Sequence, residues 1–135
     1  MMLRPRQIVI CTSLAVSFWL LATLYIRFMP VFVTDPLQGN IGFMTSIPVC
    51  WFCIWLTVRL ARLEPQQILA GCLLVLADAM MIDGIVLRWF HAVYTTDERT
   101  ARLGAAWLLW GYGISAWIAL FVANRRARLH QAPDR

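Results

Sequence analysis

Residues 68–87 read ILAGCLLVLADAMMIDGIVL, an apolar run that contains two aspartates, Asp78 and Asp83. A helix of about 20 mostly apolar residues is long enough to cross the hydrocarbon core of a bilayer. Backbone groups in lipid find no water, so a segment of this kind satisfies them internally as an α-helix. The stretch therefore predicts a transmembrane helix, and its two acids make it the first place to look for function.

Three other stretches of similar length and apolar character accompany this one, at residues 8–28, 41–58 and 104–123. The chain of 135 residues is 61% apolar and 14% charged, whereas soluble domains are about 45–50% apolar and about 25% charged. The connections are short and hold polar residues and helix breakers such as Asp35-Pro36 and Pro65. We expect residues 1–135 to form one all-α, integral membrane domain, a four-helix bundle with up-down-up-down topology.

The arginines predict how this bundle is oriented. Four lie on one side of the predicted spans, and eight lie on the other: Arg4, Arg6, Arg59, Arg62, Arg125, Arg126, Arg128 and Arg135. The positive-inside rule places the richer side in the cytoplasm, together with both termini and a tail at residues 124–135. Because the arginines flank apolar runs and form no stripe on a polar face, we expect lipid and not nucleic acid as the partner.

The two aspartates are expensive in a membrane, at about 2.5–3.5 kcal/mol each near the centre of a span. We expect at least Asp78 to be protonated or hydrogen-bonded to a neighbouring helix. The functional interpretation is a proton, cation or substrate site built from Asp78, Asp83, Arg88 and Tyr112. The structural alternative is that both acids only join helices, Asp83 by pairing with Arg27 or Arg88 and Asp78 by bonding Ser13, Ser17 or Tyr112. Five residues separate the acids by roughly 140° around a helix, so one small site holds both only if Gly84 permits an irregular turn.

Small residues repeat along the fourth apolar stretch. Gly111, Ser115 and Ala119 are spaced by four residues, and Gly104 lies on the same helical face. Small side chains at this spacing let another helix approach closely. The seam is either internal packing or a dimer face, and in a four-helix bundle internal packing is the first expectation.

Other local patterns concern helix ends and bends. Trp89 and Tyr94 are typical of aromatic anchors at the membrane interface. Thr95 followed by Glu98 fits a capping box, which predicts that the fourth long helix begins near residue 96. Pro48 removes one backbone donor and predicts a kink in the second span.

Residues 50–53 form a Cys-x-x-Cys motif, a spacing used by redox dithiols and metal sites. Cys50 would lie about 13 Å into the second span, away from soluble thiol partners. We therefore expect packing cysteines, with a thiol oxidoreductase as an alternative. Neither histidine lies near the pair, so we expect no metal. The sequence shows no nucleophile–base pairing and no phosphate-binding loop, so we also expect no cofactor and no enzymatic activity.

Residues 83–113 carry a resemblance to a known family. The similar segments are Asp83–Leu87, Phe90–Tyr94 and Gly104–Gly113, and the family is a bacterial group of small four-span membrane proteins of unknown function. The resemblance implies a bacterial inner membrane protein and supplies no catalytic residues. His91 departs from the proline associated with its position.

Three hypotheses for function follow from these patterns. The first is a small proton- or cation-coupled transporter or channel-like protein, and the second is a non-enzymatic accessory or scaffold subunit of a membrane complex. The third is the membrane thiol oxidoreductase. A single small bundle offers little interior, so we expect a homo-oligomer or a subunit of a larger complex. Small four-span multidrug exporters use a Glu in the first span, and residues 8–28 contain no acid.

Overall fold

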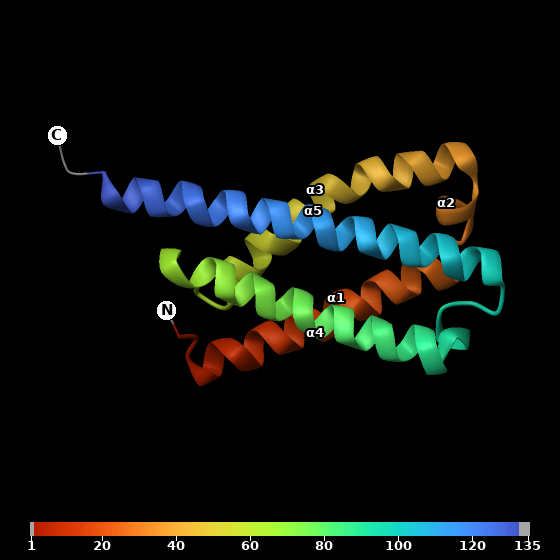
Figure 1. The fold of residues 1–135 in the computed structure, drawn as a ribbon, viewed down its shortest axis with the longest axis horizontal. Helices are drawn as coiled ribbons and strands as arrows, with labels where there is room; N and C mark the ends of the chain where they lie inside the picture. Colours follow the sequence, from red (N-terminus) through yellow and green to blue (C-terminus); the bar gives the residue numbers. More distant parts are fainter. Residues whose placement is uncertain (1, 133–135) are drawn as a thin grey trace.

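The computed structural model describes residues 2–132 of the chain, and all regular structure in that range is helical. In chain order the elements are α1 (Pro5–Phe28), α2 (Val31–Thr34), α3 (Pro36–Leu60), the 3-10 turn η1 (Pro65–Gln67), α4 (Ile68–Trp89), the 3-10 turn η2 (His91–Val93) and α5 (Glu98–Gln131). Figure 1 shows α1, α3, α4 and α5 running along one common axis, with the N- and C-termini at the same end.

These four long helices are each long and apolar enough to cross a membrane. They extend beyond the apolar stretches that predict them. The helix α3 begins at Pro36, where Asp35 caps its N-terminus by accepting from the backbone N–H groups of Leu37 and Gln38. At the other end of the chain, α5 continues through most of the predicted tail to Gln131.

Packing among the long helices is uneven. The helix α1 packs mainly on α4, and α3 packs mainly on α5, while α4 and α5 join the two pairs. One buried cluster includes Cys11, Cys72 and Ala119, and a second contains Ile26, Val33, Tyr94 and Leu108. The helices α1 and α3 touch little, so the interior is least closed along that side.

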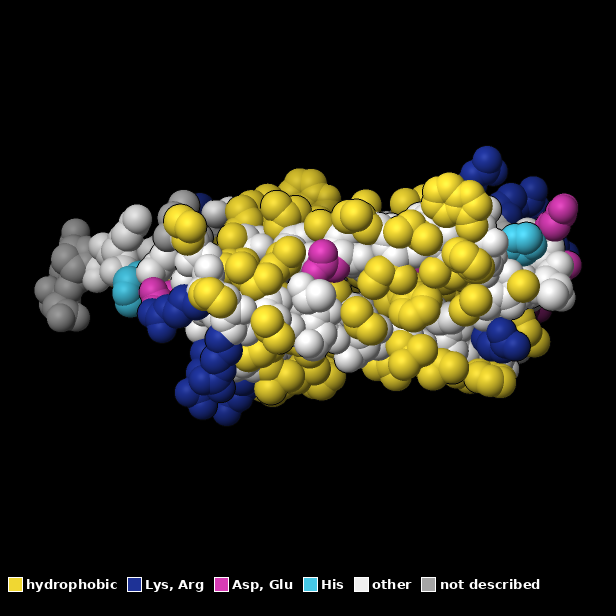
Figure 2. Space-filling view, turned by 90° about the horizontal axis from the view of Figure 1, so that it is seen from below, with side chains coloured by type: hydrophobic (Ala, Val, Ile, Leu, Met, Phe, Trp, Pro, Cys, Tyr) yellow, Lys and Arg dark blue, Asp and Glu magenta, His cyan; other side chains and the backbone are white. Residues whose placement is uncertain are grey.

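The outer surface is dominated by apolar side chains. Leu21, Leu109 and Trp117 are among many large apolar residues that are more than half exposed. Figure 2 shows hydrophobic side chains spread along the middle of the molecule, with basic side chains gathered toward its two ends. A soluble monomer rarely exposes contiguous apolar patches of this kind. The surface suits a multi-pass membrane protein.

A buried amide pair closes the end of the bundle that carries the N-terminus. Gln7 Nε2 donates to Gln67 Oε1 at 2.9 Å and to the carbonyl of Arg62 at 3.2 Å. Gln67 Nε2 donates to the carbonyl of Met2 at 3.0 Å. Arg62 has a positive φ of 48°, which lets the chain reverse between α3 and α4. The network ties the first residues of α1 to this turn.

The start of α5 differs from the sequence prediction. The helix begins at Glu98 with Asp97 as its N-cap, and not with a capping box from Thr95 to Glu98. Asp97 Oδ2 accepts from the Thr100 N–H at 2.8 Å and from the Thr100 hydroxyl at 2.6 Å. Thr95 contributes instead by accepting from the Asp97 N–H. Asp97 forms the stronger cap because its carboxylate is charged and the helix N-terminus is partly positive.

This cap predicts a local pH dependence at the start of α5. The hydrogen bonds from Thr100 hold the pKa of Asp97 below its ordinary value of 3.8. Its contribution to helix stability is therefore present above that ordinary value and is lost as the pH falls through the lowered pKa. We expect weaker protection from hydrogen exchange in the first turn of α5 in acid, measured relative to the intrinsic exchange rate at each pH. Asp97→Asn should show the same protection at either pH, and a loss of protection in acid that persists in this variant would contradict the assignment.

Candidate functional site

The strongest buried polar cluster centres on Asp83 of α4, a side chain that is 5% exposed. Tyr94 and Tyr112 each donate a phenolic O–H to its carboxylate, one to each oxygen. Trp19 Nε1 of α1 donates to the Tyr94 oxygen at 2.7 Å. Asp83 is therefore held by side chains from α5 and from the α4–α5 loop, and the loop residue is itself held by α1.

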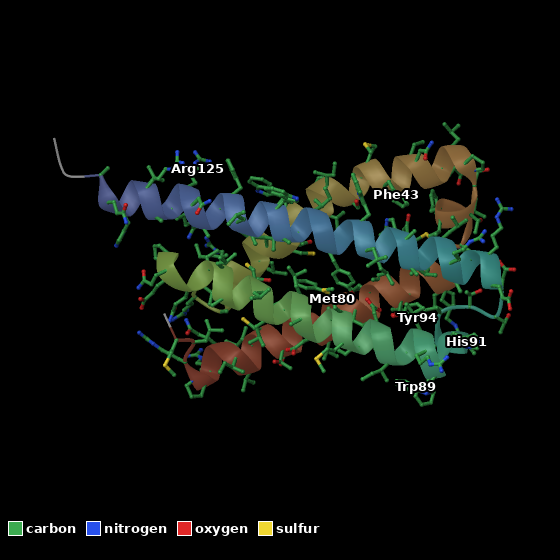
Figure 3. The ribbon with its side chains drawn as sticks, in the orientation of Figure 1. Phe43, Met80, Trp89, His91, Tyr94 and Arg125 are labelled. Atoms are coloured by element: carbon green, nitrogen blue, oxygen red, sulfur yellow. The ribbon has the colours of Figure 1, made fainter. Side chains whose placement is uncertain are left out.

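A loop contact with α1 positions Tyr94. After α4 ends, η2 turns the chain back, and Arg27 Nη1 of α1 donates to the carbonyls of Ala92 at 3.3 Å and Val93 at 2.9 Å. Tyr94 then enters the bundle and is 1% exposed, whereas Trp89 is 66% exposed. Figure 3 shows Tyr94 on the inner side of the bundle end and Trp89 on its outside.

Burial keeps Tyr94 a proton donor. Removal from water raises the pKa of the Tyr94 phenol, and the hydrogen bond to Asp83 raises it further. The phenol is neutral at any physiological pH. It can therefore donate to Asp83 permanently, while its own oxygen accepts from Trp19.

One expectation about these residues is wrong, and the arginine pairing that the structural alternative gives Asp83 is not formed. Tyr94 is no interfacial anchor, because its ring fills the interior beside Ile26 and Leu108. Asp83 also pairs with neither Arg27 nor Arg88: Arg27 is engaged by loop carbonyls, and Arg88 is exposed at the end of α4. Phenols replace the expected arginines because a long charged side chain at a helix end reaches the polar boundary more cheaply than the interior.

An apolar cavity of about 130 Å³ adjoins this cluster between the four long helices. Each helix contributes to its wall: α1 through Phe18 and Trp19, α3 through Cys50 and Cys53, α4 through Val75 and Ala79, and α5 through Trp107, Gly111, Tyr112 and Ser115. Tyr112 both lines the cavity and donates to Asp83. Only the Tyr112 phenol would thus separate a molecule in the cavity from the buried carboxylate of Asp83.

Asp78 lies apart from this site. It is half-buried on α4, and its Oδ2 accepts from the Thr12 hydroxyl of α1 at 2.8 Å. The expected partners Ser13 and Ser17 instead donate to backbone carbonyls of their own helix, and Tyr112 donates to Asp83. Asp78 is not among the side chains that line the cavity. The structure therefore separates the two aspartates, as their angular spacing on the helix predicts.

The seam of small residues on α5 faces inward. Gly104 and Ala119 are buried, and a Cβ on Gly104 would lie 3.3 Å from Ile26 of α1. Gly111 differs from these, since a Cβ there would meet nothing within 4 Å. Its missing side chain leaves room for the cavity. Ser115 is buried in the same wall.

The cysteines are free thiols. Cys50 is buried, and its Sγ donates to the carbonyl of Gly111 at 3.5 Å. Cys53 is partly buried and lines the same cavity. Within residues 2–132 no group of three or more His, Cys, Asp or Glu side chains is arranged to hold a metal ion.

Sequence reasoning missed Trp19 and Tyr94. Tyr94 sits in a polar loop, where an aromatic residue is usually interpreted as an interfacial anchor. Only the return of the loop over the end of α4 brings it to Asp83, eleven residues earlier. Trp19 lies among apolar residues of α1, and nothing in that pattern reveals that its indole N–H points inward to a phenol.

The fold and this cluster define the class of the protein. It is all-helical over residues 2–132, with four helices that could each cross a membrane and a polar cluster beside an apolar cavity between them. The chain belongs to the family of unknown function DUF5367, which it matches over residues 31–126. No curated protein and no solved structure matches the chain.

Proposed function

We propose that this chain is a four-span protein of a bacterial inner membrane, with up-down-up-down topology and cytoplasmic termini. The excess of arginine at the end of the bundle that carries both termini supports this orientation. The apolar outer surface supports immersion in lipid.

We infer that its function is the proton-coupled movement of a small cation, and that Asp83 is the proton-binding group. One observation supports this inference above the others: Tyr112 belongs both to the wall of the cavity and to the hydrogen-bond shell of Asp83. Intramembrane acids commonly serve proton or cation pathways. Trp19 and Trp107 line the cavity, and aromatic side chains can attract a cation through cation–π contact.

Proton binding and cavity occupancy would be coupled through Tyr112. The Asp83 carboxylate accepts one hydrogen bond on each oxygen. When a proton binds Oδ2, the oxygen that accepts from Tyr112, this oxygen becomes a donor, and the Tyr112 hydroxyl must turn to accept or face the cavity. A cation entering the cavity favours the carboxylate, which releases its proton. One cation taken up is thus exchanged for one proton released.

The test uses purified protein in liposomes that contain a pH-sensitive dye, with tetramethylammonium as the probe cation. We expect the probe to drive proton release by the wild type and not by Asp83→Asn. Asp78→Asn is the matched control, since it removes an acid of the same helix that does not line the cavity. Proton release that is unchanged in Asp83→Asn, or lost only in Asp78→Asn, would overturn the proposal.

Filling the cavity provides an independent prediction. Gly111→Leu places a side chain where a Cβ meets nothing within 4 Å. We expect the affinity for tetramethylammonium, measured by calorimetry, to fall about tenfold or more as contacts with the wall are lost. Stability should hold or rise, because glycine in a helix interior costs about 0.5–1 kcal/mol relative to alanine.

The matched control for that prediction is Gly113→Leu. Gly113 lies on the same helix and also has open space around its Cβ, but it is exposed and does not line the cavity. This variant should bind the probe like the wild type. Equal binding by both variants would mean that the probe does not occupy the cavity.

The second candidate function, an accessory subunit of a membrane complex, is favoured by a different observation. The half-exposed carboxyl of Asp78 lies on the outer surface of α4. Stable co-purification of another membrane protein in mild detergent would support that role.

A further inference from the structure

Asp78 lies about midway along α4, where this helix packs against α1 beside Thr12. We call the outer surface along this contact the α1–α4 groove. The Asp78 carboxyl is half-buried, and Thr12 Oγ1 donates to Oδ2 at 2.8 Å. Figure 2 shows an acidic side chain at the surface about midway along the molecule, within the region of hydrophobic side chains. Among the acids within the long helices, Asp83 is buried and Asp78 is not.

A carboxyl in this place is poorly satisfied by the chain alone. Thr12 provides one hydrogen bond, and a carboxyl group offers about four acceptor sites when charged and an O–H donor when protonated. The hydroxyls of Ser13 and Ser17 are exposed but donate to the carbonyls of Val9 and Ser13. If the helices span a bilayer, as proposed above, acyl chains provide no further partner. Another protein surface is needed to cover Oδ1.

The chemistry of the chain restricts what that surface can be. The arginines lie at or beyond the ends of the long helices, so none of them is at the depth of Asp78 in another copy. A second copy related by a two-fold axis along the membrane normal instead brings its own Asp78 to the same depth, because an isologous interface pairs each residue with its mate. One protonated Asp78 then donates its O–H to the free oxygen of the other.

The surroundings of Asp78 allow such an approach. Val9 and Met81 are 65% and 66% exposed. Val9 lies three residues before Thr12 on α1, and Met81 lies three residues after Asp78 on α4, so each is on the same face of its helix as the Thr12–Asp78 hydrogen bond. Polar side chains stabilise contacts between helices in membranes.

We propose that the α1–α4 groove is the interface with a second copy of this chain, centred on a pair of Asp78 carboxyls that share a proton. The interface lies outside the cavity, so the proposal depends on membrane insertion and not on the transport activity. A protein that is monomeric but still releases protons with tetramethylammonium would overturn the interface alone.

Site-specific cross-linking tests whether the α1–α4 groove forms the contact between two copies. Met81→Cys and Leu109→Cys are matched, since both parent side chains are 66% exposed, the first on α4 beside the groove and the second on α5. The wild type with its four native cysteines is the background control. In native membranes treated with a short bis-maleimide, we expect a dimer band from Met81→Cys that exceeds those of the wild type and Leu109→Cys. No dimer above background, or a stronger one from Leu109→Cys, would overturn the proposal.

Variants of Asp78 test the chemistry of the pair. Asp78→Asn retains hydrogen-bonding groups that can pair across the two-fold axis, whereas Asp78→Leu has none. We expect Asp78→Leu to weaken the dimer by about three- to tenfold relative to Asp78→Asn, measured by subunit exchange in bilayers. Equal dimer affinity in the two variants would refute the pair. A different membrane protein cross-linked to Met81→Cys, with no homodimer, would assign the groove to that partner and also overturn the proposal.

Discussion

Replacing Asp83 with leucine is expected to destabilise the folded bundle severely. Asp83 accepts from the buried phenol of Tyr94 and the half-buried phenol of Tyr112, and leucine leaves both O–H groups without this acceptor. A buried donor without a partner costs about 1–3 kcal/mol, so the two together cost about 2–6 kcal/mol. The measurement is the free energy of unfolding in detergent micelles, followed by tryptophan fluorescence.

Two further variants separate stability from proton binding. Asp83→Asn keeps an acceptor oxygen and should retain most of the fold while losing proton release. Adding Tyr112→Phe to Asp83→Leu should recover part of the lost stability, because it removes one of the two hydroxyl groups that have lost their acceptor. If the double variant is no more stable than Asp83→Leu, the hydrogen bond from Tyr112 does not contribute as proposed.

The four long helices could be predicted from the sequence because each depends on local composition. Stretches such as residues 68–87 are apolar over a full membrane thickness, and no tertiary contact is needed to recognise them. Their ends were harder to predict. The helix α5 continues to Gln131 because residues such as Arg125, Arg126 and Ala127 have high helix propensity and extend a helix that already exists.

The candidate site could be predicted only in part. The composition of α4 singles out both aspartates, but their environments depend on the helices beside them. Asp83 faces α5 and the returning loop, whereas Asp78 faces the edge of α1. Which helices are neighbours follows from packing, and no single stretch of sequence specifies it. Trp19 joins the site through its hydrogen bond to Tyr94, which lies 75 residues later in the chain.

Gly42→Ala is expected to destabilise the protein although it adds only a methyl group. A Cβ at Gly42 would lie 2.9 Å from the carbonyl oxygen of Phe32 in α2, which is backbone and cannot turn aside. It would also lie 3.3 Å from the Tyr25 hydroxyl. Overpacking of this kind costs about 1–3 kcal/mol. The free energy of unfolding in micelles measures it, as for Asp83→Leu.

The same substitution at Gly84 is the control. Gly84 is also within a long helix, but a Cβ there meets nothing within 4 Å. Gly84→Ala should therefore stabilise the protein by about 0.5–1 kcal/mol through helix propensity alone. If both variants change the free energy of unfolding in the same direction, α2 can move to accommodate the added methyl group and does not constrain α3.

We also expect Gly42→Ala to change the shape of the cavity. Tyr25 stacks on Trp107 with ring centroids 4.8 Å apart, and Trp107 Nε1 donates to the carbonyl of Gly42 at 3.4 Å. A methyl group that moves α2 or Tyr25 therefore disturbs Trp107, which forms part of the cavity wall. We expect weaker tetramethylammonium binding in Gly42→Ala and unchanged binding in Gly84→Ala. Loss of stability without loss of binding would mean that the Tyr25–Trp107 stack supports the fold but not the shape of the cavity.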